Sequence, residues 1–165
     1  MKKLLGFILM LPFLVWGGTR KVADIQYSRY CGDHLKRAAD ANTVDLAITE
    51  MDTALTYIES HNLTQGYTNV LWTTPDCDMG FWYKNLTQAR DELKAVKPET
   101  AMLERTNILM KLRETLLDHG SRGSESVTQP EGISIAPNNL GYALWGWMSG
   151  LIGLVGAVLF MVGLD

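Results

Sequence analysis

The feature that most constrains this chain is a run of 23 residues without any charge near its C-terminus, residues 142–164. An α-helix needs about 20 apolar residues to cross the hydrocarbon core of a bilayer, so this run is long enough to span one with some tilt. Tyr142, Trp145 and Trp147 gather at its leading end, and such amphipathic rings favour the level of the lipid headgroups. The sequence therefore predicts a transmembrane helix, with the lipid bilayer as its partner.

Small residues in this run recur every four positions, in two rows that share one side of a helix. Gly146 and Gly150 form one row, and Ser149, Gly153 and Ala157 form the other. Because these side chains are small or absent, the backbone of a second helix can approach closely. The rows predict a packing face, although glycine is also common in membrane helices in general. The N-terminal segment, a second copy in a homo-oligomer, and another membrane protein all remain open as the partner.

The N-terminal residues 1–18 have the pattern of a secretory signal peptide. A basic pair, Lys2 and Lys3, precedes a run of 13 apolar residues that ends at Trp16. This run is short for a membrane span, which favours a signal peptide. An uncleaved signal anchor is the alternative, because Trp16 is a poor neighbour for a cleavage site and Arg20 begins a basic flank. Both readings predict export of the region that follows.

The orientation follows from the N-terminus. If the basic pair stays inside, the central region lies on the exported side, and the bacterial look of the N-terminus predicts the periplasmic face of a bacterial inner membrane. A lipid-anchored precursor is a weaker alternative. Small residues at positions 132–136 precede the uncharged tail, as they do in signals for a glycosylphosphatidylinositol anchor.

The region between the two apolar ends carries nearly all of the charge. Residues 20–141 hold 13 of the 15 Lys and Arg and 17 of the 18 Asp and Glu, so the formal charge of this region is 13 − 17 = −4. Such a composition predicts a water-exposed domain. The mild net charge of −3 for the whole chain, without a basic stripe, excludes nucleic acid as an expected partner.

Apolar residues in this domain follow the three- and four-residue spacing of amphipathic helices. The pattern is clear over residues 44–58, 79–96 and 102–116, and a weaker one covers about residues 20–41. No alternating run is long enough to predict a sheet. Because the connections are short, the sequence predicts an all-α fold, a small antiparallel bundle of three to four helices over residues 19–120.

Two polar parts of the domain are predicted to be exposed. Glu50, Asp52 and Glu59 recur on the polar face of one predicted helix and are expected to be a solvated surface. Residues 121–141 are rich in Gly, Ser and Pro, and they predict a flexible tether between the bundle and the membrane helix.

The stretch TTPDCDMGFWY, residues 73–83, resembles the start of a calcium loop, because two aspartates and a glycine lie close together. An EF-type loop also needs oxygen ligands at its fifth and twelfth positions, and this chain has Gly80 and Thr87 there. A helix start accounts for the same residues. Thr74 is a suitable cap, proline suits the first turn, and the aspartates favour the positive end of the helix dipole.

Four aromatic residues in and beside this stretch have two interpretations: Trp72, Phe81, Trp82 and Tyr83. Phe81, Trp82 and Tyr83 are expected to pack under the loop of residues 66–74, which supplies Trp72, since a small bundle needs bulky groups to cover its end. The alternative is an exposed patch that binds a partner.

Cys31 and Cys77 are the two cysteines, and both lie in the region expected to be exported. An even count in an oxidising compartment predicts one disulfide between them. A metal site is the weaker alternative, with Cys31, His34, Cys77 and Asp78 as its ligands. That set lacks the paired spacing of zinc sites, so no metal and no cofactor are expected.

No motif of a known enzyme class occurs in the chain, since it has no GxSxG, Walker loop, HExxH or dinucleotide fingerprint. The sequence therefore favours a non-enzymatic binding or assembly module that is tethered to a membrane. One alternative is a small accessory subunit of a membrane complex, docked through the glycine-rich helix. Another is a metal-dependent or redox activity at Cys31, His34 and Cys77.

Overall fold

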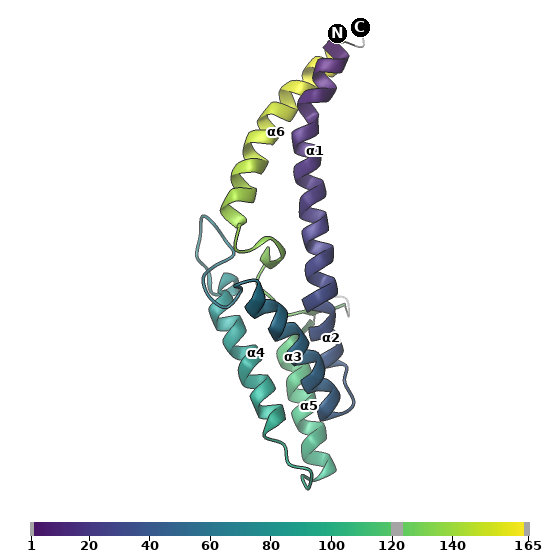
Figure 1. Cartoon of the computed structure of the whole chain (residues 1–165), viewed down its shortest axis with the longest axis vertical. Coiled ribbons are helices and arrows are strands. Elements are labelled where there is room, and N and C mark those ends of the chain that lie inside the picture. Colours follow the sequence, from purple (N-terminus) through teal and green to yellow (C-terminus); the bar gives the residue numbers. More distant parts are fainter. Residues whose placement is uncertain (1, 120–123, 164–165) are drawn as a thin grey trace.

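The computed structural model describes residues 2–119 and 124–163, and this part of the chain is mostly helical, as the all-α prediction requires. Figure 1 shows an elongated molecule with two regions. Two long helices, α1 (Lys2–Tyr27) and α6 (Asn139–Val162), run side by side to a tip where both ends of the chain lie. The remaining helices pack at the other end. We call α1 and α6 the hairpin, and α2 to α5 the bundle.

The N-terminal helix does not end where the apolar segment ends. α1 continues through a π-helical turn (Ser28–Gly32) into α2 (Asp33–Ala39). The backbone of Tyr27 has φ −59° and ψ −49°, which are helical values, so the course of the chain is unbroken there. The predicted boundary between residues 18 and 19 is therefore not a boundary between two structural elements. The weak helical pattern over residues 20–41 is the second half of one long helix.

Three helices lie where the apolar spacing predicts them: α3 (Val44–Ser60), α4 (Met79–Lys94) and α5 (Met102–Leu116). The Thr43 side chain caps α3 by accepting a hydrogen bond from the Leu46 amide. α4 begins later than the predicted cap at Thr74, because a 3₁₀ turn (Pro75–Cys77) comes first. Asp78 then caps α4 by accepting a hydrogen bond from the Phe81 amide at 3.0 Å.

The core of the protein lies between these helices, which run in alternating directions along the chain (Figure 1). α3 and α4 contribute the apolar faces that their sequence spacing predicts, whereas Met102, the first position of the α5 pattern, is 85% exposed. α2 contacts α3 and α5, and α3 contacts α4. The fully buried side chains include Leu35, Met51, Leu55, Ile58, Leu86, Leu93 and Leu116.

The segment after α5 packs on the bundle, which contradicts the predicted flexible tether over its described part. β1 (Leu117–His119) pairs with β2 (Glu125–Val127) in a short antiparallel ladder. The indole of Trp82 then donates a hydrogen bond to the Thr128 carbonyl at 2.8 Å. In the 3₁₀ turn Ile133–Ile135, Ile133 is 3% exposed. A few apolar side chains dock this segment, although its overall composition is that of a linker. Residues 121–123 lie outside the described part.

Candidate functional site

A close contact between distant parts of the chain lies between the two hairpin helices. Near the tip, Gly6 and Gly156 face each other, and both are buried. A Cβ atom added at Gly6 would lie 2.6 Å from the Gly156 carbonyl oxygen. One added at Gly156 would lie 2.7 Å from the Gly6 carbonyl oxygen. The two backbones therefore touch here, which is the contact that small residues allow between membrane helices.

The predicted packing face of α6 lies against α1. Gly146 faces the ring of Trp16, while Gly150 and Gly153 face the ring of Phe13. Ser149 is 2% exposed and donates a hydrogen bond to the Gly146 carbonyl at 3.3 Å. Ala157, at the end of its row, is half-buried. Of the three partners that the sequence leaves open, the structure brings the N-terminal segment to this face. Sequence reasoning did not single out Gly6 or Gly156, although Gly156 follows Gly153 and Ser149 at helical spacing.

The hairpin opens towards the bundle, where α1 and α6 diverge (Figure 1). Trp16 bridges this part by donating its indole hydrogen to the Tyr142 carbonyl at 2.8 Å. The guanidinium of Arg20 lies 5.3 Å from the centre of the same ring, within the range of a cation–π interaction. A cavity of about 710 Å³ lies beside these residues, with mostly apolar walls from both helices. An aromatic and a basic group thus mark the end of the apolar section of α1.

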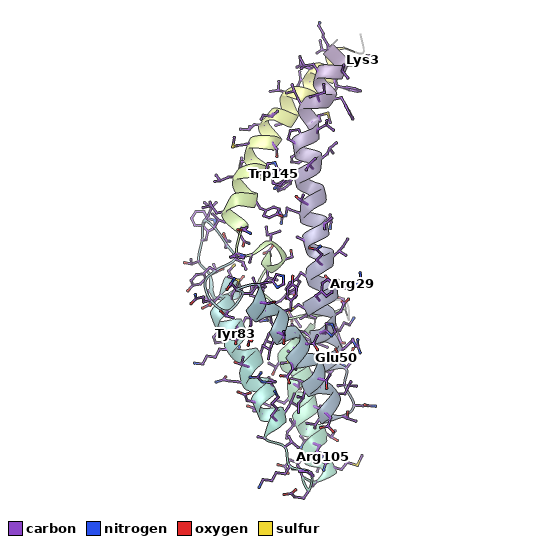
Figure 2. The ribbon with its side chains drawn as sticks, viewed as in Figure 1. Lys3, Arg29, Glu50, Tyr83, Arg105 and Trp145 are labelled. Atoms are coloured by element: carbon purple, nitrogen blue, oxygen red, sulfur yellow. The ribbon has the colours of Figure 1, made fainter. Side chains whose placement is uncertain are left out.

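The outer faces of the hairpin are apolar and exposed, as the side chains in Figure 2 show. Both helices are long and apolar enough to cross a membrane. A core helix of a soluble protein passes the same test, but it is mostly buried. Here only 6% of the most apolar window is buried in the helix that begins at Lys2, and 17% in α6. The hairpin helices are therefore not core helices within the described chain.

Inside the bundle, Glu50 differs from its prediction as a solvated residue, because it is 5% exposed. It points from α3 towards α2 (labelled in Figure 2), where His34 Nδ1 lies 2.6 Å from its Oε2 atom. A nitrogen of the Arg37 guanidinium lies 2.6 Å from the other oxygen. Glu50 directly precedes Met51, which belongs to the buried face of α3. This position at the edge of the buried face places Glu50 against the neighbouring helix α2. The partners offset the cost of burying the carboxylate.

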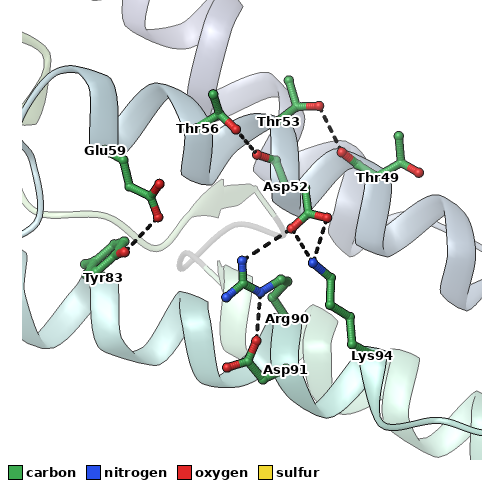
Figure 3. A network of polar contacts seen from close by, with 9 residues as sticks. All are labelled: Thr49, Asp52, Thr53, Thr56, Glu59, Tyr83, Arg90, Asp91 and Lys94. Atoms are coloured by element: carbon green, nitrogen blue, oxygen red, sulfur yellow. Dashed lines mark hydrogen bonds and ion pairs between the residues drawn. The ribbon is translucent and has the colours of Figure 1, made fainter.

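A second polar network joins α3 to α4 near the surface (Figure 3). Asp52 accepts from the Lys94 ammonium at 2.9 Å and from the Arg90 guanidinium at 3.4 Å. These bonds, the one from Lys94 first, lower the pKa of the Asp52 carboxyl below its usual value of 3.8. Tyr83 donates to a Glu59 oxygen at 2.8 Å, and this raises the pKa of the phenol above 10.0. The network joins α4 to α3.

The predicted disulfide is not formed, since Cys31 and Cys77 are both free. Cys31 is fully buried within the bundle core, where burial raises the pKa of its thiol to about 12. Cys77 lies in the turn before α4 and accepts a hydrogen bond from the Thr74 hydroxyl at 3.2 Å. Reading the two cysteines as a pair relied on their number and compartment, which carry no information on distance.

The four candidate metal ligands do not come together either. His34 is engaged with Glu50, Asp78 caps α4, and the two cysteines lie in different surroundings. Within residues 2–119 and 124–163, no group of three or more His, Cys, Asp or Glu side chains is placed to hold a metal ion.

The predicted aromatic patch divides into two parts. Trp82 is 7% exposed in the core and Tyr83 is half-buried on Glu59. Trp72 and Phe81 are instead 71% and 63% exposed. The loop of residues 66–74 therefore leaves the Trp72 side chain exposed, although its Thr68 is buried.

Comparison with models of known protein families, with curated proteins and with solved structures finds no match to this chain. The conclusions on function below therefore rest on the geometry described above.

Proposed function

We propose that the protein is a membrane-anchored, non-enzymatic binding or assembly module. In this proposal α1 and α6 cross the membrane together as a retained hairpin, and the bundle is presented on the exported side, the periplasm in a bacterium. The observation that carries the proposal is the contact between the backbones of Gly6 and Gly156. Close packing at glycines is the way in which helices associate in lipid, where no hydrophobic force drives them together.

The exposed surface of the hairpin supports the same conclusion. Its large apolar side chains are mostly more than one-third exposed, including Leu4 on α1 and Leu151 and Leu154 on α6. Such a surface in water would favour aggregation, whereas lipid covers it without cost. Charged residues resume at Arg20 and Lys21 of α1, directly after its apolar section.

The lengths of the two helices are compatible with one membrane. The 24 residues of α6 correspond to about 36 Å at 1.5 Å per residue. The uncharged section of α1, residues 4–19, corresponds to only about 24 Å. Lys3 and Arg20 flank that section, and their long side chains can extend to the headgroups and cover the difference. The inclination of α6 to α1 in Figure 1 accommodates its greater length.

Retention of the N-terminal segment distinguishes this proposal from a cleaved signal peptide. Cleavage before Gly18 would remove Phe13 and Trp16, and it would leave the glycine face of α6 without its present partner. The intact mass of protein purified from membranes decides between the two. We expect the mass of the full chain, 18.4 kDa. A mass that lacks the first 17 residues would refute the retained hairpin.

The side on which the bundle lies needs a separate measurement. Met102, at the start of α5, is 85% exposed, and the two native cysteines are buried. A Met102→Cys variant expressed in intact bacterial cells should therefore react with a maleimide that cannot cross the membrane. Labelling only after the cells are opened would place the bundle inside and overturn the orientation. A Leu154→Cys variant, expected within lipid, is the unreactive control.

An accessory subunit of a membrane complex is the second candidate, and the cavity beside the hairpin favours it. Because α1 lies on the glycine face, a larger partner would dock on the outer faces or in this cavity. Recovery of a stoichiometric complex in mild detergent would support this candidate, and recovery of the chain alone would favour the free-standing module. Redox or metal chemistry at Cys31, His34 and Cys77 gains no support from their positions.

A further inference from the structure

A group of exposed apolar side chains outside the hairpin lies in the connection between α3 and α4. The sequence carries no charge from residue 62 to residue 75. Within it, residues 67–72, which we call the apolar loop, hold four large exposed side chains. Their exposed fractions are 48% for Tyr67, 39% for Val70, 76% for Leu71 and 71% for Trp72.

The apolar loop has a defined conformation and is held at its base. The Thr68 amide donates to the Cys77 carbonyl at 3.0 Å, and the Met79 amide donates to the Gly66 carbonyl at 2.9 Å. At the tip, the Asn69 side chain accepts hydrogen bonds from the amides of Leu71 and Trp72. This Asx-type turn satisfies the backbone locally, while the side chains of Leu71 and Trp72 stay exposed. Their exposure is therefore built into the fold.

The position of the apolar loop along the molecule indicates which surface its exposed side chains contact. Figure 1 shows the loop between α3 and α4 at the end of the bundle nearest the hairpin, level along the long axis with the start of α6. Tyr142 and Trp145 belong to that first part of α6, and Trp16 bonds to the Tyr142 carbonyl. Aromatic residues at the end of a membrane span mark the level of the headgroups. The loop thus lies at the level along the molecule that these aromatic residues mark.

We propose that the apolar loop inserts Leu71 and Trp72 into the headgroup region of the membrane that the hairpin crosses, as a third point of membrane contact. This proposal rests on the proposed function, because it needs the hairpin in the membrane. The region of the membrane that these side chains enter is the uncharged boundary between headgroups and acyl chains. No cation lies among residues 62–75 to attract an anionic lipid, and Asp76 and Asp78 follow directly. Trp and Leu are the side chains that favour this boundary.

The test uses the full chain in phosphatidylcholine vesicles, with a polarity-sensitive fluorophore on a single introduced cysteine. Cys31 and Cys77 are buried at 0% and 4% exposure, so the dye reacts at the new position. The test position is Leu71→Cys. Met102→Cys, at the opposite end of the bundle near Arg105 (Figure 2), is the control for water. Leu154→Cys on α6 is the control for lipid.

The expected result is that the dye at position 71 loses most of its fluorescence to a spin-labelled lipid, is protected from aqueous iodide, and emits at shorter wavelength than the dye at position 102. Adding anionic lipid should leave these values unchanged. Free access of iodide to position 71, with position 154 quenched by lipid, would overturn the loop proposal alone. Protection from iodide without quenching by lipid would assign the loop to a protein partner or a second copy, which also overturns it. Failure of lipid to quench position 154 would instead overturn the hairpin.

Discussion

Substituting alanine at Gly6 tests the contact on which the proposed hairpin rests. The new Cβ atom would lie 2.6 Å from the Gly156 carbonyl oxygen and 2.7 Å from the Phe160 nitrogen. Both are backbone atoms, so no side chain can rotate to make room. Ordinary contact begins at 3.4 Å, and the helices must therefore separate locally by 3.4 − 2.6 = 0.8 Å.

The magnitude follows from overpacking against a fixed neighbour. Forcing an extra methyl group into a well-packed contact costs about 1–3 kcal/mol. Alanine also favours the helix over glycine by about 1 kcal/mol. Gly18→Ala isolates that second effect, since Gly18 lies in the same helix and a Cβ there meets no described atom within 4 Å. We expect Gly6→Ala to be less stable than Gly18→Ala by about 1–3 kcal/mol.

The assay compares the two variants in mild detergent. Thermal unfolding, followed by tryptophan fluorescence, should give a midpoint several degrees lower for Gly6→Ala than for Gly18→Ala. Spin labels at Leu4→Cys and Met161→Cys, both exposed near the tip, report the separation of the two helices directly. The distance distribution should broaden in Gly6→Ala and stay as in the parent chain in Gly18→Ala. Equal midpoints and equal distributions for both variants would refute the glycine contact, and with it the hairpin.

Three further predictions concern the bundle. Glu50→Gln should lower the free energy of unfolding, measured by chemical denaturation, by about 1–3 kcal/mol, because His34 and Arg37 lose their buried carboxylate partner. The exposed Glu104→Gln is the control and should leave this free energy unchanged. Asp52 should titrate below 3.8 by NMR. Because this pKa is lowered in the folded state, the ionised carboxylate stabilises the fold at pH values above the unfolded-state pKa, and this stability is lost as the pH falls through the folded-state pKa. The contribution is less than about 1 kcal/mol because the pair with Lys94 is partly exposed. Asp52→Asn should weaken the dependence of the free energy of unfolding on pH. Trp82→Phe removes the hydrogen bond to the Thr128 carbonyl. We expect faster amide hydrogen exchange in the segment after β2, with little change in α4. Unchanged exchange in that segment would mean that this hydrogen bond does not hold it.

The helices of the bundle could be predicted from the sequence because their information is local. α3 begins at Val44, where the apolar stripe begins, and ends two residues after the last stripe position, Ile58. The stripe that starts at Met79 likewise marks the first residue of α4. In each case the apolar face that is read from the spacing is the face that the core buries.

Contacts between distant segments were harder to predict, because the spacing of small residues indicates that another helix packs closely and does not identify that helix. The glycine rows of α6 predicted a close neighbour, but Gly6 lies 150 residues earlier in the chain than Gly156. Glu50 lies one position from the apolar stripe, and only the placement of α2 decides that it is buried. The tether prediction relied on average composition, whereas a few interactions, among them the burial of Ile133 and the Trp82–Thr128 hydrogen bond, dock this segment on the core.

The continuity of α1 and α2 gives the two proposals a common mechanical consequence. A helix without a break between Lys2 and Ala39, with only a π turn at Ser28–Gly32, transmits the direction of its membrane section to the bundle. One helix alone would leave the bundle free to rotate about that axis. The return through α6 and the insertion of the apolar loop add two contacts that do not lie on the axis, so that both tilt and rotation are fixed. In the proposed arrangement, the connection between α4 and α5, at the opposite end of the bundle in Figure 1, is the part farthest from the membrane and faces the exported compartment.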